Sequence, residues 1–346
     1  MSLERIKIAP NCEISRLIKG GWHLAGGHGP IDRARAIEDM AAFVEAGITT
    51  FDCADIYSGV EELIGEFRRA YPDLAGRVQI QTKFVPDFDK LPHLEPAQIE
   101  AIIDRSRSRL SADALDLVQF HWWDTSIPKY VQAALELQRL RDAGKIRQIG
   151  LTNFNTACTQ EILEAGVPIV STQIQYSILD DRAAASLSAY CLEHGVALLC
   201  YGSLAGGFFS HDWLGQPEPA STFENRSLTK YKLIIDDFGG WNLFQELLET
   251  LQAIAARHDS SIAQIASSWT LAQPAVAAVI IGATSSRHLA QNVRIPEIKL
   301  SAEDLLVIKR ITDRRSGPLQ DVYDLERDKL GRHGRIMKYN LNEDRP

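Results

Sequence analysis

Short runs rich in β-branched residues alternate along the chain with segments whose apolar residues recur at helical spacing. The eight runs are RLIKGGW (16–22), ITTFDCAD (48–55), VQIQTKF (78–84), LDLVQFHW (115–122), IRQIGLTN (146–153), PIVSTQIQYS (168–177), VALLCYGSL (196–204) and AVAAVIIGA (275–283). We predict that the strands end near Trp22, Asp52, Lys83, His121, Thr152, Gln175, Tyr201 and Gly282. Helices are expected over 31–47, 61–71, 96–110, 130–145, 156–166, 182–195 and 244–259, and again from Ser261 and from Ser285.

This repeat favours one α/β barrel over two domains. A strand–helix unit takes about 30 residues, and the first seven strand ends recur at roughly that interval. A doubly wound sheet is the alternative, but the turn GGWHLAGGHGP after the first strand does not match GxGxxG, and the chain has no P-loop motif. We therefore predict a single (β/α)8 TIM barrel over residues 1–317.

Three pieces of chain exceed what a minimal barrel needs. ERIKIA (4–9) and EISRLI (13–18) are expected to form an N-terminal β-hairpin that closes the barrel floor. The segment Gly202–Trp241, after the seventh strand, is too long for a structureless connector and is expected to be a flap over cofactor or substrate. Residues 318–346 form a C-terminal extension that is expected to pack on the barrel or on a partner subunit.

Composition and charge narrow the class of protein. The 346 residues are 45% hydrophobic, and 37 Lys and Arg stand against 45 Asp and Glu, a net charge of −8. This balance argues against nucleic-acid or anionic-membrane partners. No apolar run approaches the roughly 20 residues of a membrane span, and the charged start does not fit a signal peptide. The five scattered cysteines suit a reducing compartment, so we expect a cytoplasmic protein.

Polar side chains at consecutive strand ends point to a chemical function. In a barrel, the C-terminal strand ends carry the active site, and here they bring Asp52 and Tyr57, then Lys83, then His121. Each residue alone has an ordinary explanation, such as a helix cap, a half-buried ring, a surface lysine or a core histidine. Together they place proton-active groups at one level of three consecutive strands.

Proton donation to a carbonyl is the chemistry that these residues suit. A lysine ammonium about 4 Å from a tyrosine stabilises the phenolate by up to about 4 kcal/mol, enough to lower a pKa of about 10 by two or three units. Asp52 would keep Lys83 protonated, and His121 would hydrogen-bond the carbonyl oxygen. The missing component is a hydride, which no side chain provides.

These residues resemble the aldo-keto reductase family through FDCADIY, the TK of QTKF, and DLVQFHWW, with similarity over about residues 14–314. The resemblance implies an NADPH-dependent reductase that converts an aldehyde or ketone to an alcohol. It makes Tyr57 the general acid, Asp52 and Lys83 its tuning pair, and His121 the orienting residue. It also implies a small-molecule carbonyl substrate and no metal.

The same resemblance assigns cofactor contacts. Thr152, Asn153 and Gln173 would bind the nicotinamide carboxamide, and Tyr201 would stack on the ring. The full expected set is Gly21, Trp22, Asp52, Thr152, Asn153, Gln173, Tyr201, Gly202, Ser203, Leu204, Gly206, Ile281, Gly282, Thr284, Ser285, Arg287, Gln291 and Asn292. Many members hold the 2′-phosphate with a lysine and an arginine where this chain has Gly282 and His288, so Arg287 or Arg294 would replace them. NADH is therefore the alternative cofactor.

Independently of the family, a helix that starts at Ser285 or Ser286 would offer free N–H groups to an anion, although an ordinary capped helix explains the same residues. The expected substrate wall is Trp22, Tyr57, Phe84, His121 and Trp122. Because neighbours on a strand face opposite ways, only one of Trp122 and Trp123 is expected to line the pocket.

Two rival functions remain at this stage. A class I aldolase would use Lys83 as a Schiff-base nucleophile, but Asp52 would push the pKa of the lysine in the wrong direction. The second rival is a nucleotide-binding regulatory subunit, similar to the potassium-channel β subunits, with little turnover. Measured turnover of aldehydes separates this rival from a reductase.

Overall fold

The computed structural model describes residues 3–25, 31–219, 223, 225–283 and 285–342. Eight parallel strands form a closed barrel in the order β10-β3-β4-β5-β6-β7-β8-β9. They are β3 (Leu17–Gly20), β4 (Thr50–Asp52), β5 (Gln79–Phe84), β6 (Leu115–Phe120), β7 (Ile146–Thr152), β8 (Ile169–Gln175), β9 (Ala197–Tyr201) and β10 (Val276–Gly282). The predicted (β/α)8 barrel is confirmed, and its strands end close to the predicted positions.

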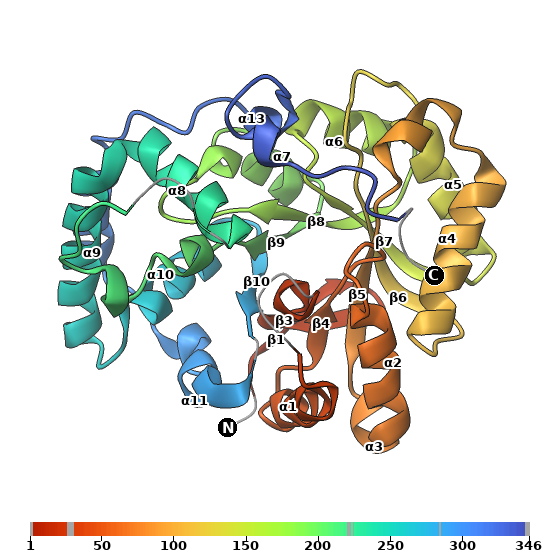
Figure 1. Cartoon of the computed structure of the whole chain (residues 1–346), viewed down its shortest axis with the longest axis horizontal. Coiled ribbons are helices and arrows are strands. Elements are labelled where there is room, and N and C mark those ends of the chain that lie inside the picture. Colours follow the sequence, from red (N-terminus) through yellow and green to blue (C-terminus); the bar gives the residue numbers. More distant parts are fainter. Residues whose placement is uncertain (1–2, 26–30, 220–222, 224, 284, 343–346) are drawn as a thin grey trace.

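Helices surround the barrel, and Figure 1 looks roughly along the barrel axis. They are α1 (Arg33–Glu45), α2 (Val60–Ala70), α3 (Pro72–Ala75), α4 (Pro96–Arg109), α5 (Tyr130–Asp142), α6 (Thr156–Glu164), α7 (Leu187–Glu193), α8 (Arg226–Phe238), α9 (Gly240–Arg257), α10 (Ile262–Leu271), α11 (Leu289–Asn292), α12 (Ala302–Thr312) and α13 (Asp324–Arg327). Short 3-10 turns are η1 (Trp22–Leu24), η2 (Phe88–His93), η3 (Arg182–Ala184), η4 (Ala205–Gly207), η5 (His211–Trp213), η6 (Ser286–His288), η7 (Ile295–Glu297) and η8 (Gly334–Ile336). Among the described residues, no helix has the length and apolar character needed to cross a membrane.

Side chains on β5 show how strand alternation positions the site. Lys83 points into the barrel, where it meets Asp52. Its neighbours point outward: Thr82 donates to Glu61 of α2, and Phe84 packs in the layer between strands and helices. A strand with both faces buried thus carries polar chemistry on its inner face only.

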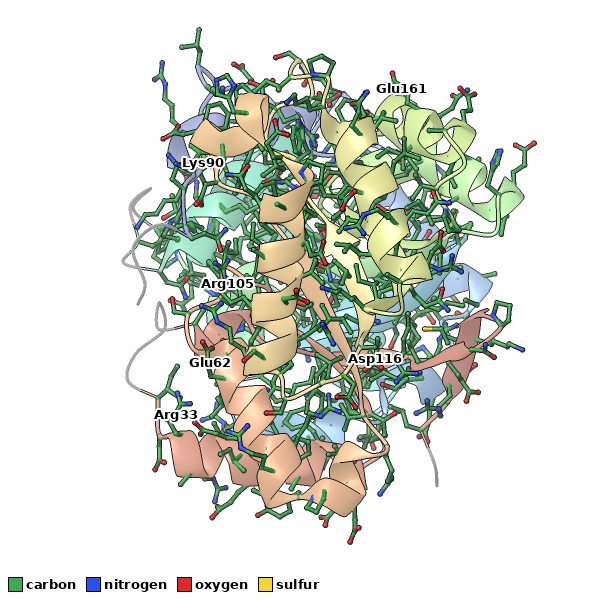
Figure 2. All side chains as sticks on the ribbon, turned by 90° about the vertical axis from the view of Figure 1, so that its right-hand side faces the viewer. Arg33, Glu62, Lys90, Arg105, Asp116 and Glu161 are labelled. Carbon is green, nitrogen blue, oxygen red and sulfur yellow. The ribbon has the colours of Figure 1, made fainter. Side chains whose placement is uncertain are left out.

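The N-terminal hairpin closes the barrel floor, as expected. β1 (Arg5–Ala9) pairs antiparallel with β2 (Cys12–Ser15). Ile14 of the hairpin packs in one apolar cluster with Leu117 and Leu199 of the barrel strands. The second hairpin strand ends at Ser15 rather than continuing to Ile18, because the next residues already pair with β10. Figure 2 shows the barrel from the side of α4 and α5, with the hairpin on the right and Lys90, after β5, on the left.

The segment after β9 contains a helix where we expected an irregular flap. Helix α8 lies within 202–241, and the Asn225 side chain accepts a hydrogen bond from Ser227 N–H at its start. Ile234, Ile235 and Phe238 of this helix pack into a second apolar cluster with α9 and α10. These apolar contacts explain why the segment forms a packed layer outside the barrel.

The C-terminal segment, defined here as residues 318–342, folds back over the C-terminal strand ends. In Figure 1 it passes over α7 and α6 and runs toward α4. Asp321 accepts a hydrogen bond from Thr156 N–H, and Asn342 donates to the carbonyl of Val85. We call the end of the barrel that it crosses the mouth. Helix α12, which precedes this segment, was also not anticipated.

Candidate functional site

A buried ion pair lies at the mouth, beside a tyrosine ring. Lys83 Nζ donates to both carboxylate oxygens of Asp52 and to the carbonyl oxygen of Cys53, each at 2.8 Å. The same nitrogen is 4.9 Å from the centre of the Tyr57 ring. Neighbouring strands β4 and β5 supply the pair, and the loop after β4 supplies the tyrosine. Three predicted catalytic residues are therefore together.

Two glutamines complete the surroundings of Asp52. Its Oδ1 atom accepts hydrogen bonds from Gln119 Nε2 at 3.2 Å and from Gln173 Nε2 at 2.6 Å. Gln173 was expected to contact the nicotinamide, yet its amide nitrogen is directed at Asp52. Gln119 was missed, although it lies two residues before His121 and therefore on the same face of β6.

The electrostatics keep protons on both Lys83 and Tyr57. Burial lowers the pKa of Lys83, but the Asp52 carboxylate outweighs it, so the net pKa is raised. For Tyr57, burial raises the pKa and the Lys83 ammonium only partly offsets it, so the pKa lies above 10.0. The expected lowering of this pKa is thus wrong in its net direction, because the cost of a buried phenolate exceeds the attraction of a lysine already paired with Asp52.

His121 lies on the next strand and is neutral. Its Nδ1 atom is 3.2 Å from the carbonyl oxygen of Thr152, so the neutral ring carries its proton on Nδ1. Burial first, and the Arg327 charge second, lower the pKa of His121 to about 3. Its Nε2 atom is buried and has no hydrogen-bond partner within the described ranges. In this tautomer Nε2 accepts a hydrogen bond, whereas we expected His121 to donate one to a carbonyl.

Aromatic rings border the predicted catalytic groups. Trp22 of η1 contacts Tyr57 edge-on, with ring centres 5.1 Å apart. Trp123 contacts His121 edge-on at 4.5 Å. Two tryptophans therefore flank the acid and the histidine, which supports the expectation that the mouth has an apolar wall.

The structure does not bring Phe84 and Trp122 to this wall, and the expectation is corrected for both. Phe84 stacks on Phe120, and Trp122 meets Phe120 edge-on, in the layer between strands and helices. The reason is strand parity: because Lys83 and His121 face inward, the residues that follow them face outward. Trp123, rather than Trp122, is the tryptophan beside His121.

The C-terminal segment adds two residues that sequence reasoning missed. The ring of Tyr323 contacts the His121 ring edge-on at 5.5 Å, and the residue is only 5% exposed. Arg327 donates to the carbonyl oxygens of Asn153 and Trp122. No local pattern signalled either residue, because both lie about 200 positions after the strands that they contact.

Residues expected to hold the nicotinamide end gather at the ends of β7 and β9. Tyr201 donates its hydroxyl hydrogen to Asn153 Oδ1 at 2.8 Å. Lys230 of α8, which was not predicted, places Nζ 5.0 Å from the centre of the Tyr201 ring. Ser203 is buried against Ser267 of α10. Gly202 and Gly206 both have positive φ and lie against Tyr231. Leu204 lies between these two glycines in the sequence. Gly21 lies at the end of β3.

The segment after β10 is less helical than expected. Only the turn η6 and the four residues of α11, which include Gln291 and Asn292, are helical. Asp39 of α1 accepts a hydrogen bond from Ser286 N–H at 3.1 Å, so a carboxylate already caps this turn. Ile281 is buried, whereas Gly282, Ser285 and Arg287 are exposed. Thr284 lies outside the described residues.

A family model described as "Aldo/keto reductase family" matches residues 16–313. The chain belongs to this family. Aldo-keto reductase YhdN of Bacillus subtilis (strain 168) is 28% identical over 311 residues, covering 87% of this chain and 91% of the relative. The NADH-specific methylglyoxal reductase of Escherichia coli (strain K12) is 25% identical over 322 residues, covering 87% and 95%. Aldo-keto reductases are generally oxidoreductases.

Solved structures of this family share the fold. The aldo-keto reductase from Klebsiella pneumoniae, solved in complex with NADPH, has a TM-score of 0.69 at 22% identity, covering 93% of this chain and all of that one. The Escherichia coli enzyme is thus NADH-specific, and the Klebsiella enzyme was crystallised with NADPH. The aldo-keto reductase family as a whole uses nicotinamide cofactors, and these two proteins differ in the nucleotide that their names give.

Proposed function

We propose that this aldo-keto reductase reduces an aldehyde or ketone to an alcohol with NADPH, and that Tyr57 donates the proton. The observation that carries the proposal is the contact chain at the mouth. Lys83 Nζ lies 2.8 Å from both oxygens of Asp52 and 4.9 Å from the centre of the Tyr57 ring. This arrangement fits a fixed positive charge beside a phenol that must give up its proton during turnover.

The raised pKa of Tyr57 is compatible with this role. The phenol stays protonated across the neutral range because burial raises its pKa above 10.0. Its proton is needed only when negative charge develops on the carbonyl oxygen, and an alkoxide is a much stronger base than a phenolate. The Lys83 ammonium then stabilises the phenolate that remains.

His121 takes a different part from the one first expected. With its proton on Nδ1, directed at Thr152, the free Nε2 atom can accept the hydroxyl hydrogen of an alcohol. We propose that His121 holds the alcohol form of the substrate by this bond. The neighbouring Trp123 fixes the imidazole plane by edge-on contact.

The residues at the ends of β7 and β9 fit a nicotinamide nucleotide. Tyr201 offers an aromatic ring, Asn153 an amide and Lys230 a cation, and these groups suit a nicotinamide ring, its carboxamide and a phosphate. When bound, the nucleotide supplies the hydride that no side chain provides. We propose that these residues hold its nicotinamide half and that the segment from Gly282 to Asn292 holds its adenosine half.

For the nucleotide, NADPH is our first choice and NADH the alternative. Arg287 and His288 are exposed and adjacent after β10, with Arg287 Nε 3.1 Å from His288 Nε2, and they support a 2′-phosphate site. Asp39 argues against a 2′-phosphate site here, because its carboxylate already accepts the hydrogen bond from Ser286 N–H that a phosphate would need.

A Schiff-base role for Lys83 has no support from the geometry. A nucleophilic lysine must spend time neutral, with a free lone pair. Here the three protons of Nζ match three acceptors at 2.8 Å, and Asp52 favours the charged form.

The proposal is tested by steady-state reduction of an aldehyde and ketone panel with NADPH and with NADH. Nucleotide affinity is measured in parallel by fluorescence titration. Turnover with either nucleotide supports a reductase. Tight nucleotide binding with no turnover across the panel would favour the regulatory alternative instead. A small-molecule carbonyl substrate and a cytoplasmic location stay predictions.

A further inference from the structure

Arg327, the last residue of α13, places a guanidinium at the rim of the mouth. Its Nη2 atom donates to Asn153 O at 2.6 Å and to Trp122 O at 3.3 Å. These carbonyls belong to the residues that directly follow Thr152 and His121 at the ends of β7 and β6. The guanidinium is therefore hydrogen-bonded at the ends of β6 and β7, the strands that also carry His121 and its hydrogen-bond acceptor, Thr152.

This cation forms no ion pair in the part of the chain that the structure describes: the Asp324 and Glu326 carboxylates act on it only through space, and its direct neighbours are the Phe154 and Tyr323 rings. Its Nε and Nη1 atoms are buried and have no hydrogen-bond partner there. Arg182 differs from Arg327 in this respect, because it forms ion pairs with both Asp180 and Glu326. A partly buried guanidinium left without a carboxylate costs free energy, which a negatively charged ligand would recover.

Arg327 is close to the catalytic groups through a single aromatic ring. Tyr323 lies 5.5 Å from the His121 ring centre to centre, and its own ring centre is 5.1 Å from Arg327 Cζ. The His121 Nε2 atom is likewise buried and unpartnered among the described residues. Two unsatisfied polar groups, one neutral and one cationic, thus both lie close to the ring of Tyr323. A small molecule with a hydroxyl group at one end and an anion at the other matches both.

We propose that Arg327 binds the carboxylate of the substrate, so that this enzyme acts on small carbonyl compounds that carry a carboxylate group. The inference rests on the proposed reductase function and adds its substrate class. Arginine suits this task because its planar donors match a carboxylate, and hydrogen bonds between charged groups are about twice as strong as neutral ones. A phosphate of the nucleotide is the other possible anion, and the test distinguishes the two.

The test compares 4-oxobutanoate with its methyl ester, which differ only in the negative charge. We expect wild-type kcat/KM to be at least tenfold higher for the acid. Arg327→Met should lower kcat/KM for the acid by about 10- to 100-fold, the range of one or two charged hydrogen bonds, and leave the ester nearly unchanged. Arg335→Met is the matched control, because Arg335 is an exposed arginine of the same segment. It should change neither substrate.

Binding is measured without turnover as an independent readout. 4-Hydroxybutanoate, whose hydroxyl group can donate to His121 Nε2, should raise the melting temperature of the wild type with nucleotide bound, unlike its methyl ester, and this shift should be lost in Arg327→Met. Arg327→Lys keeps a charge and covers the case in which the methionine variant does not fold. It should retain part of the preference for the acid.

Each remaining outcome decides against the inference or against its basis. A wild type that prefers the ester, or an acid-to-ester ratio that Arg327→Met leaves unchanged, would overturn the substrate class while the reductase function stands. Loss of nucleotide affinity in Arg327→Met with an unchanged ratio would assign Arg327 to the cofactor. If neither compound nor any other carbonyl is reduced, the proposed function itself fails, and the 4-hydroxybutanoate binding measurement still reports on Arg327.

Discussion

Lys83 holds a positive charge beside the phenol ring of Tyr57. Lys83 is held on Asp52 and Cys53, so its ammonium cannot move away from the phenol ring. In the proposed mechanism, this fixed charge acts mainly when Tyr57 becomes a phenolate, so we expect a change at Tyr57 to affect turnover more than nucleotide binding.

Replacing Tyr57 by phenylalanine removes the proposed proton donor and leaves the ring in contact with Trp22. We expect kcat to fall by about 10²- to 10⁴-fold, the usual contribution of a general acid, with nucleotide affinity changed little. Steady-state rates and fluorescence titration measure the two quantities. Retention of activity within a few-fold of wild type would mean that another group donates the proton.

His121 makes the stability of the fold depend on pH. Its pKa is about 3 in the folded chain against 6.5 for an ordinary histidine, so between these values the unfolded chain binds a proton that the folded chain does not. The free energy of unfolding therefore falls as the pH drops below 6.5, by up to about 1.4 kcal/mol per unit from this residue. The free energy of unfolding, measured with urea at several pH values, should change less steeply with pH for His121→Asn than for wild type. Equal slopes would contradict a neutral, buried His121.

The sequence was sufficient for some of these residues and not for others. Asp52, Lys83 and His121 could be predicted because each follows a buried strand directly, and parallel strand ends meet at one edge. The outward direction of Phe84 and Trp122 also followed from the inward direction of Lys83 and His121, but strand alternation was applied only to the choice between Trp122 and Trp123. Tyr323 and Arg327 could not be found, because only long-range packing brings them to the strands.

Among the elements, helix α8 depends on a close approach to the loop after β9. Gly202 has φ of +79°, and a Cβ atom there would lie 2.4 Å from Tyr231 Oη. The loop after β9, which contains several of the expected cofactor contacts, and the helix that carries Lys230 are thus in direct contact. The strand–helix repeat of the barrel did not predict this helix, because its apolar face packs in a second apolar cluster outside the barrel.

Gly202→Ala should separate α8 from this loop. A left-handed conformation and the steric overlap together should cost about 2–5 kcal/mol of stability, with a weaker affinity for nucleotide. Gly207→Ala is the control, since Gly207 also has positive φ but open space around its Cα, and it should cost about 1–2 kcal/mol. Tyr231→Phe should partly rescue Gly202→Ala. Equal losses for the two alanine variants would show that the contact with Tyr231 has no effect.

The turn η6 separates the two candidate nucleotides. Arg287 is exposed next to His288, whereas Asp39 caps the turn from α1. Arg287→Ala should weaken NADPH binding by about 10-fold or more and NADH binding much less, because only NADPH carries the additional phosphate. Titration with both nucleotides measures this difference. An equal loss would place the 2′-phosphate elsewhere.

At the scale of the whole molecule, the C-terminal segment is held to the barrel by ion pairs at several points. The most deeply buried joins Glu326 to Arg182 at 3.2 Å, with both side chains almost fully buried. Lys329 pairs with Asp124 nearer the surface. The barrel and its hairpin could be predicted from the repeating pattern. For the C-terminal extension, the sequence indicated only packing on the barrel or on a partner subunit, and its path could not be predicted, since its contacts have no periodicity.

Glu326→Gln should weaken the attachment of the segment. The loss of charged hydrogen bonds to Arg182 should cost about 1.5–3 kcal/mol and speed proteolysis after residue 318. Glu246→Gln, which removes the carboxylate from an exposed pair with Arg314, is the matched control and should cost at most about 1 kcal/mol. Urea unfolding and limited proteolysis report the two effects. Equal behaviour of the two variants would show that the buried pair does not hold the segment.

The path of the C-terminal segment also sets the order in which parts of the fold can form during synthesis. Asn342 bonds the carbonyl of Val85 across 257 positions, and Arg327 reaches Trp122 across 205. During synthesis, at about 5–20 residues per second, strands β3 to β10 emerge before any of these partners exists. The ring of strands can therefore close first, and the surroundings of His121 are finished only after Tyr323 and Arg327 have been made.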